Sequence, residues 1–484
     1  MTRNFDLRVI AVDAAATGET RKSRFAPAMS AGPIKAMFAG DGRSQPLGRS
    51  SIAALVVLVV GAGLSYVAQL VTARIIGPDS FGVYAYVLAW VTLLGYFSTL
   101  GFHVSLLRFV PAYQAKEEWN LVRGVIQYSQ RGAAGTAIGI VLIGVCGIVA
   151  LHSSLGPELT LTFLLGIAAV PFLALHLIGA SAVRAFGGIT AALAPERIVR
   201  DGLLLAIVAA VFWGNMYRLD ATLAMGATLL SSIVVLGLVR IFLRRLRPPA
   251  LDHAKPTFTA GDWWRPTLPL TAIMIADNFM SRSAVIALGL AGNTRDAGIF
   301  AVAFSMATLM ALPRMAVATV FAPTVSALFA RGDQAGLQSL SAKAACLSLL
   351  GTAGAAIPLL LLARSFLAWF GRDFVAGAPI VTILVLGQVL AAACGPQQHL
   401  ITMTGHERAG AAILGLCAGV SFAGCILTVH WFGMTGAAVV TTVTLVGWNV
   451  AMGIFIHRGL HLMPGLVASL KAMPRRKRAA DCGI

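Results

Sequence analysis

Two long apolar runs, separated by a compact turn, constrain this chain more than any other feature. The runs cover residues 52–73 and 83–109, and each exceeds the roughly 20 residues that cross a hydrocarbon layer about 30 Å thick. Between them lies Gly77-Pro78-Asp79, in which proline presets φ while glycine and aspartate tolerate tight bends. Lipid offers the backbone no hydrogen-bond partner, so apolar runs of this length fold as helices. The stretch predicts a transmembrane helical hairpin.

The composition extends this prediction to the whole chain. Of the 484 residues, 58% are hydrophobic and 12% are charged, whereas soluble domains carry about 25% charged residues. We therefore predict an all-α polytopic membrane protein with about twelve transmembrane helices. The expected spans lie near residues 51–73, 83–109, 125–151, 159–184, 198–213, 221–243, 265–291, 298–321, 341–363, 376–403, 409–430 and 436–457.

The hairpin recurs in the second half of the sequence. Gly298-Ile299-Phe300-Ala301 follows a short polar turn and aligns with Gly82-Val83-Tyr84-Ala85. Two halves of six spans each would enter the membrane in the same orientation, as parallel repeats in transporters do, and the substrate path lies between such repeats. The alternative is a coincidental likeness of two hairpins.

The spans also predict the order of domains. Residues 1–49 form a disordered basic cytoplasmic tail, 50–243 an N-terminal six-helix bundle, 244–264 a cytoplasmic linker, 265–457 a C-terminal six-helix bundle, and 458–484 a second basic cytoplasmic tail.

The net charge of +18 raises the question of a nucleic-acid partner. Most lysines and arginines fall on one side of the predicted topology, including Arg240, Arg244 and the run Arg475–Arg478. This is the excess expected of cytoplasmic segments, so both termini are placed in the cytoplasm. Anionic lipid headgroups then supply the counter-charge, and no nucleic-acid partner is expected.

No metal or organic cofactor is predicted. The six cysteines show no metal-ligand spacing and are typical of buried small hydrophobic residues. The sequence contains no phosphate-binding glycine loop, no His-Glu-x-x-His and no Gly-x-Ser-x-Gly. The predicted outer loops are short, so no soluble catalytic domain is inserted and the chain is not expected to be an enzyme.

Polar residues within the spans are the candidate binding residues, because a charge at mid-membrane costs roughly 2.5–3.5 kcal/mol on insertion scales. Asp277, Asn278 and Arg282 fall within the seventh span. A fixed guanidinium attracts a phosphate or pyrophosphate and donates several hydrogen bonds to it, so Arg282 is the leading substrate-binding candidate, with Asn278 beside it. Asp277 is a candidate for carrying a coupling proton or sodium ion. Alternatively, each side chain is paired with a neighbouring helix and only holds the bundle together.

A second polar group lies in the tenth span, where Gln388, Gln397 and Gln398 surround Gly395-Pro396. Amide side chains offer both donors and acceptors to sugar hydroxyls, so these glutamines are predicted to contact a glycan. Arg74, at the outer end of the first span, is a further candidate for substrate binding, with extension toward lipid headgroups as the alternative.

Prolines predict bends in two spans. Pro266 and Pro269 begin the seventh span, and Pro313 precedes Arg314 in the eighth. Broken helices in transporters often frame a binding site; these prolines could equally mark interfacial helix ends.

The hairpin sequence Ala73-Arg74-Ile75-Ile76-Gly77-Pro78-Asp79-Ser80-Phe81-Gly82-Val83-Tyr84 resembles the first-hairpin signature of polysaccharide-biosynthesis transporters. These are the O-antigen, exopolysaccharide and teichoic-acid exporters of the multidrug/oligosaccharidyl-lipid/polysaccharide exporter superfamily. Later parts of the same pattern resemble Leu107-Arg108-Phe109-Val110, Ala322-Pro323 ahead of Arg331-Gly332-Asp333, and Met403-Thr404-Gly405-His406-Glu407.

This resemblance, which covers roughly residues 50–460, implies two six-helix bundles around a central cavity that work by alternating access. The implied cargo is an undecaprenyl-pyrophosphate-linked oligosaccharide, moved from the cytoplasmic to the periplasmic leaflet of the bacterial inner membrane. Family members tend to have cationic cavities, for which Arg282 is the best mid-span match. Glycosyltransferases and a polymerase of the same pathway are the implied partners.

Three other functions were weighed. A cation-coupled multidrug antiporter of the related multidrug and toxin extrusion branch would need an acidic cavity, and only Asp277 is predicted at mid-span. A membrane polysaccharide polymerase or ligase typically needs a large outer loop, which the sequence lacks. The lipid II flippase branch usually has fourteen spans and a more basic cavity. The sequence favours the oligosaccharide flippase.

Overall fold

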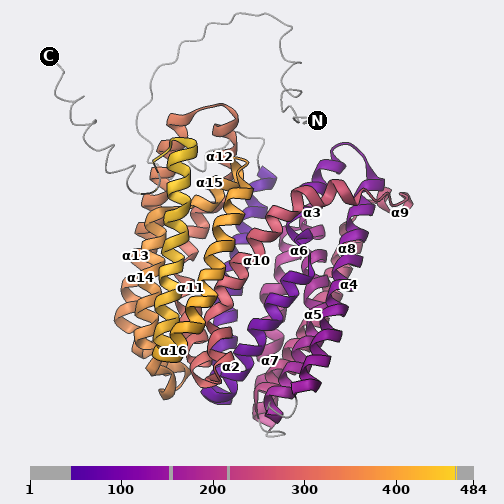
Figure 1. Ribbon diagram of the computed structural model, residues 1–484. Coiled ribbons are helices and arrows are strands. Elements are labelled where there is room, and N and C mark those ends of the chain that lie inside the picture. The colour runs from indigo at the N-terminus through magenta and orange to yellow at the C-terminus, as the bar shows by residue number, and fades with distance from the viewer. Residues whose placement is uncertain (1–44, 152–155, 215–218, 464, 466–484) are drawn as a thin grey trace, which may run out of the picture. The chain divides into compact units, whose positions relative to one another are not determined.

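The computed structural model describes residues 45–151, 156–214, 219–463 and 465, and Figure 1 shows their arrangement. Most of the two predicted tails lies outside these residues. Within them the chain is helical and has no β-strand. The helices are α2 (Gln45–Ser98), α3 (Phe102–Gln114), α4 (Trp119–Leu151), α5 (Pro157–Ala185), α6 (Ile189–Ala194), the π-helical turn η2 (Pro195–Val199), α7 (Arg200–Gly214), α8 (Ala221–Leu246), α9 (Ala250–His253), α10 (Ala260–Leu290), α11 (Thr294–Leu309), α12 (Leu312–Ala330), α13 (Gln334–Phe370), the 3-10 helix η3 (Arg372–Gly377), α14 (Ala378–Cys394), α15 (Gln397–Met403) and α16 (Glu407–Leu460).

Several of these helices correspond to more than one membrane crossing. Among the described residues, 8 helices are long and apolar enough to cross a membrane, or 9 if the bent pair α11–α12 counts as one span. Both α2 and α16 contain a glycine with non-helical backbone, Gly77 (φ 79°) and Gly433 (φ 53°), at which one helix ends and the next begins. A positive φ suits glycine because it has no Cβ. If α2 and α16 are each divided at these turns, and α6, η2 and α7 are taken as one further crossing, the described residues hold twelve crossings, the number that the sequence predicts.

The described helices pack in two groups that follow the two halves of the sequence. In the first group α5 packs against α3, α4 and α8, and α7 packs against α8. In the second group α16 packs against α10 and α14, and α13 packs against α12 and α14. Figure 1 shows α4, α5 and α8 running alongside one another, as do α13, α14 and α16.

Helix α10 contacts both groups. Near its beginning, Trp263 Nε1 donates a hydrogen bond of 3.1 Å to the hydroxyl of Tyr113 at the end of α3. Further along, the hydroxyls of Ser283 and Ser421 of α16 lie 3.1 Å apart. The helix runs from Ala260 to Leu290 without a break at Pro266 or Pro269, so the bend predicted at these prolines stays a prediction. The bend predicted at Pro313 is confirmed, because α11 and α12 meet at 43°.

Two glycines join the groups at one end of the bundle, which we call the hairpin end (residues 77–82 and 291–298). A Cβ on Gly298 would lie 2.8 Å from the Cα of Gly82 and 2.8 Å from the carbonyl oxygen of Pro78. A Cβ on Gly82 would lie 1.8 Å from the carbonyl oxygen of Thr294. The predicted repeat pairs Gly82 with Gly298, so the first turns of equivalent helices cross with their backbones in contact.

Side chains on both groups surround this glycine crossing. The rings of Phe81 and Phe374 pack edge to face with centroids 6.1 Å apart. Arg295 lies 3.7 Å from the carboxylate of Asp79 and 3.0 Å from that of Asp373. These ion pairs are exposed, and exposed pairs contribute about 0–1 kcal/mol each. The apolar and backbone contacts therefore dominate the closure of the hairpin end.

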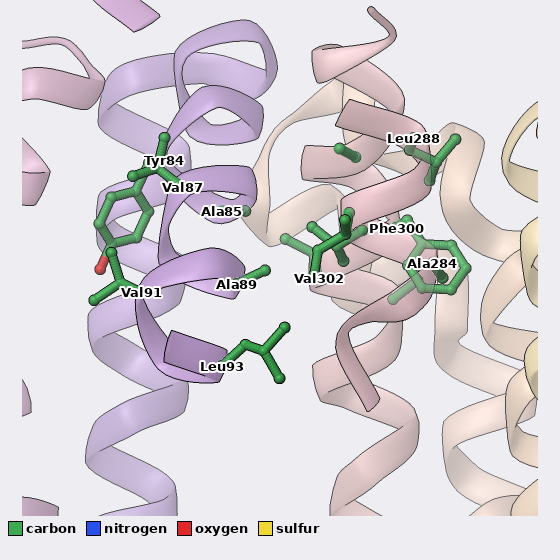
Figure 2. Packing of buried hydrophobic residues seen from close by; sticks show 14 of the residues in the cluster. Tyr84, Ala85, Val87, Ala89, Val91, Leu93, Ala284, Leu288, Phe300 and Val302 are labelled. Atoms are coloured by element: carbon green, nitrogen blue, oxygen red, sulfur yellow. The ribbon is translucent and has the colours of Figure 1, made fainter. Parts of the chain in front are cut away.

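The buried core continues from the glycine crossing between the groups. Figure 2 shows Ala85 and Ala89 of α2 facing Val302 of α11, with Phe300 of α11 and Ala284 of α10 packed behind. All five are at most 8% exposed and belong to one hydrophobic cluster. Small residues on α2 allow its second helix to pack closely against α11, as is common between membrane helices.

We expect Gly298→Ala to lower the midpoint of thermal unfolding in detergent, because the new methyl group would press on the backbone of Gly82, and overpacking costs roughly 1–3 kcal/mol. The matched control is Gly147→Ala, since a Cβ there meets nothing within 4 Å. Both changes raise helix propensity by a similar amount. Equal midpoints for the two variants would contradict the tight crossing.

Candidate functional site

A cavity lies between the two helix groups and has two adjoining parts. The N-half part, of about 390 Å³, is lined mainly by α2, with further residues from η2, α7, α8, α10 and α11. The C-half part, of about 540 Å³, is lined mainly by α10, α12, α14, α15 and α16. Both parts share the side chains of Arg197, Asn278, Ser281, Arg282 and Phe304. Residues of both halves therefore meet where the two parts adjoin.

The structure brings together six of the seven residues that the sequence predicts as site residues. All six line the C-half part: Asp277, Asn278, Arg282, Gln388, Gln397 and Gln398. They come from three helices, because α14 ends at Cys394 and α15 begins at Gln397 after the break that Gly395-Pro396 makes. Two polar groups more than a hundred positions apart in the sequence thus face one cavity. Their roles in binding stay predictions.

Arg74 lies elsewhere. It is near the hairpin end, where its Nη1 donates a hydrogen bond of 3.0 Å to the carbonyl oxygen of Trp369. Its side chain lines neither part of the cavity. This position favours a role in joining α2 to the end of α13.

Sequence reasoning missed most of the cations in the cavity. Arg197, Arg200 and Arg314 line it together with Arg282. The fifth span was predicted to begin at residue 198, yet the helical segment begins at Ile189. At 1.5 Å per residue, Arg197 of η2 and Arg200 of α7 lie roughly 12–17 Å along this segment from its first residue, Ile189. Hydropathy alone assigns such a charged stretch to the membrane boundary.

The charged stretch also has an unusual backbone. Pro195–Val199 forms a π-helical turn between α6 and α7, a feature that often marks functional sites. Gly61 of α2 packs directly on this turn, because a Cβ there would lie 2.6 Å from the Cβ of Arg197. The sequence signal that could have located the turn is a proline followed by mixed charges within an apolar region.

Only part of this charge is neutralised by protein groups. Arg200 Nε lies 2.9 Å from Asp201 Oδ1, and Asp201 also accepts a hydrogen bond from Ser65 of α2. The ion pairs within 4 Å among the described residues include neither Arg197 nor Arg282. Their guanidinium groups can therefore bind an anionic ligand.

The acidic residues of the cavity limit its positive charge. Glu196 and Asp201 line the N-half part, and Asp277 lines the C-half part. Four arginines face three carboxylates among the described lining residues. The excess is small, so an anion is best held by Arg197 and Arg282, the two arginines that line both parts and have no carboxylate within 4 Å among the described residues.

Two amide side chains that line the C-half part, Gln397 and Asn449, hold oxygens that are not paired. Their Oε1 and Oδ1 atoms are buried and have no hydrogen-bond partner among the described residues. An unpaired buried acceptor costs about 1–3 kcal/mol, so a rearrangement that exposed either oxygen to a donor in the cavity would be favoured. Asn449 was overlooked in the sequence, although an asparagine inside the last apolar run was visible there.

Residues 47–329 match the polysaccharide biosynthesis protein family. The chain belongs to this family. Among curated proteins, none matches it.

Solved transporter structures share the fold of this polysaccharide biosynthesis protein. An inward-facing multidrug resistance MATE family transporter of the MOP superfamily gives a TM-score of 0.67 at 15% identity, covering 83% of this chain and 97% of that one. The lipid II flippase MurJ in an inward closed conformation gives 0.63 at 13% identity, covering 84% and 87%. A MOP superfamily transporter from Pyrococcus furiosus gives 0.58 at 15% identity, covering 88% and 98%.

These similarities confirm the predicted all-α, MATE-like fold. The identities are too low to carry more than the fold, and the family membership adds a place in polysaccharide biosynthesis. The protein is a multi-pass membrane protein of the polysaccharide biosynthesis family.

We expect Asp201→Asn to destabilise this protein, because it leaves Arg200 without its paired carboxylate. Asp201 is 5% exposed, while the Arg200 side chain keeps 32% exposure toward the cavity. The loss in the free energy of unfolding should exceed the roughly 1 kcal/mol that an exposed ion pair contributes. It should stay below the roughly 3–5 kcal/mol that is lost when a fully buried pair is broken.

Asp252→Asn is the matched control, since it breaks the exposed pair in which Arg247 lies 2.8 Å from Asp252. Thermal unfolding of the two purified variants in one detergent measures the difference. An Asp201→Asn protein as stable as the control would show that the cavity pair contributes nothing.

Proposed function

We propose that this protein moves an undecaprenyl-pyrophosphate-linked oligosaccharide from the cytoplasmic to the periplasmic leaflet of the bacterial inner membrane, for O-antigen or exopolysaccharide biosynthesis. The observation that carries the proposal is the position of Arg197 and Arg282. Arg197 comes from the N-terminal half of the chain and Arg282 from the C-terminal half. Each of these two arginines lines the N-half part and the C-half part of the cavity.

A diphosphate suits this pair of arginines. Guanidinium groups bind phosphate oxygens through paired, charge-assisted hydrogen bonds. Two arginines on opposite helix groups can each contact one phosphate of a diphosphate, which a ligand with one neutral headgroup does not offer. The ligand would then hold the two halves at a fixed separation.

The C-half part suits the sugar portion. Its amide groups (Asn278, Gln388, Gln397, Gln398 and Asn449) supply donors and acceptors for hydroxyls. Trp448 lines the same wall, and a large aromatic ring provides an apolar face against which a sugar ring can pack. Its volume of about 540 Å³ falls within the range of small-molecule sites, about 300–1,000 Å³.

Transport in this proposal proceeds by alternating access. The glycine crossing closes the hairpin end, which faces the periplasm in this proposal. Release into the outer leaflet then requires Gly82 and Gly298 to separate while the opposite end closes. Both termini lie in the cytoplasm, where glycosyltransferases of the pathway can meet the basic surface and a polymerase can act on the exported unit.

A cation-coupled multidrug antiporter is the second candidate. Glu196 and Asp277 face the cavity, and MATE transporters share the fold. Family membership and the arginines at the junction favour the oligosaccharide, and Asp277 remains the candidate for carrying a coupling ion.

The test is the accessibility of the lipid-linked glycan to a membrane-impermeant label on spheroplasts. Deletion of the protein should trap the glycan inside, and the wild type should restore outer labelling. Arg282→Ala should reduce the transport rate about tenfold or more, because a hydrogen bond to a charged group contributes about 1.5–3 kcal/mol, and 1.4 kcal/mol is tenfold.

Arg458→Ala is the matched control, because Arg458 is exposed at the end of α16 and lines neither part of the cavity. It should transport at the wild-type rate. Labelling that is unaffected by deletion would refute the oligosaccharide function. Normal transport by Arg282→Ala in a deletion-sensitive strain would place the diphosphate elsewhere.

A further inference from the structure

A groove outside the central cavity lies on the first helix group. Its volume is about 230 Å³, and it shares no lining residue with either part of the cavity. Helix α5 forms its floor between α4 and α8. The lining residues are Gln130, Arg131, Ala134, Leu175, Gly179, Leu236, Val239, Arg240 and Leu243.

The two arginines of the groove lie at the same membrane boundary. Residues 132–151 of α4 form an uncharged run of twenty residues after Arg131, which spans about 30 Å at 1.5 Å per residue. Residues 221–239 of α8 form a similar run before Arg240, about 29 Å long. Each run matches the thickness of a bilayer core, about 30 Å. Both guanidinium groups are therefore at the depth of lipid headgroups.

Below the arginines the walls are apolar. Leu175 of α5 and Leu236 of α8 line the groove toward the membrane interior. Gly179 lets the helices pack closely, because a Cβ there would lie 2.7 Å from Cγ1 of Val239. The small side chain of Ala134 leaves space beside α4. A charged rim above an apolar channel fits a molecule with an anionic head and a hydrocarbon chain.

The charge of the rim is not neutralised by the protein. Both Arg131 and Arg240 are exposed, and the ion pairs within 4 Å among the described residues include neither. The guanidinium carbon of Arg131 lies 6.0 Å from the ring centroid of Phe258, in the segment that leads into α10. Arg131 itself lines the groove, and Gln130 adds a neutral donor to the same lining.

We propose that this groove binds an anionic phospholipid of the surrounding membrane. The phosphate lies between Arg131 and Arg240, and one acyl chain runs along Leu175 and Leu236. Basic pockets between membrane helices bind anionic lipid headgroups in this way. The groove shares no lining residue with the cavity, so we assign its occupant as a membrane phospholipid and not the transported cargo.

The experiment measures lipid retention by the purified full-length protein, using native mass spectrometry with phosphatidylglycerol or phosphatidylcholine and no cargo. The wild type should retain one phosphatidylglycerol at concentrations that leave phosphatidylcholine unbound. The double variant Arg131→Gln/Arg240→Gln should bind phosphatidylglycerol at least about tenfold more weakly. The control Arg245→Gln/Arg458→Gln removes the same charge from exposed positions outside the groove and should bind as the wild type does.

A third variant separates a defined site from general surface charge. Ala134→Leu keeps both arginines and fills the space beside α4, so it should also weaken binding. Three results would overturn the proposal: equal loss in the control, equal retention of phosphatidylcholine, or unchanged binding by the double variant. Since glycan labelling on spheroplasts is a separate assay, failure here leaves the proposed transport untouched.

Discussion

Backbone contact between Gly82 and Gly298 is the constraint on which the rest of the structure depends. Any side chain at either position would push two helices apart, and the sequence places a glycine at both. Because the contact joins equivalent turns of the two halves, it closes the hairpin end. Farther along the same helices the halves diverge around a cavity lined by both.

The cavity explains how the chain accommodates charge inside the membrane. Arg197, Arg200, Arg282 and Arg314 would each be costly against lipid, but here they line a space between helix groups. Asp201 and Ser65 hold Arg200 in place, whereas Arg197 and Arg282 have no carboxylate within 4 Å among the described residues. Arg200 thus has a structural role, whereas Arg197 and Arg282 are the positive charges available to a ligand. This division supports a site for a diphosphate in an otherwise nearly balanced cavity.

Much of the fold follows from the sequence, because lipid restricts a long apolar run to a helix. The apolar spans, the turn at Gly77 and the bend at Pro313 were all visible as local patterns, whereas the break at Gly395-Pro396 falls inside a stretch predicted as one span. Six predicted site residues face one cavity because polar side chains in a span must avoid lipid. The features that the sequence did not reveal depend on tertiary structure. Arg197 lies deep in the bundle because α6 and η2 extend the fifth crossing, and hydropathy cannot distinguish a charged cavity wall from a loop.

The measurement that tests the account most directly is transport with the hairpin end locked. Asp79→Cys and Arg295→Cys replace an ion pair across the closure, in a background without the native cysteines, and a short cleavable bifunctional maleimide joins them. The account predicts that cross-linking stops outer-leaflet glycan labelling, and that cleaving the linker restores it. Each single-cysteine variant, treated in the same way, should continue to transport. Unchanged transport by the cross-linked protein would show that the glycine crossing does not have to open, and would contradict the account.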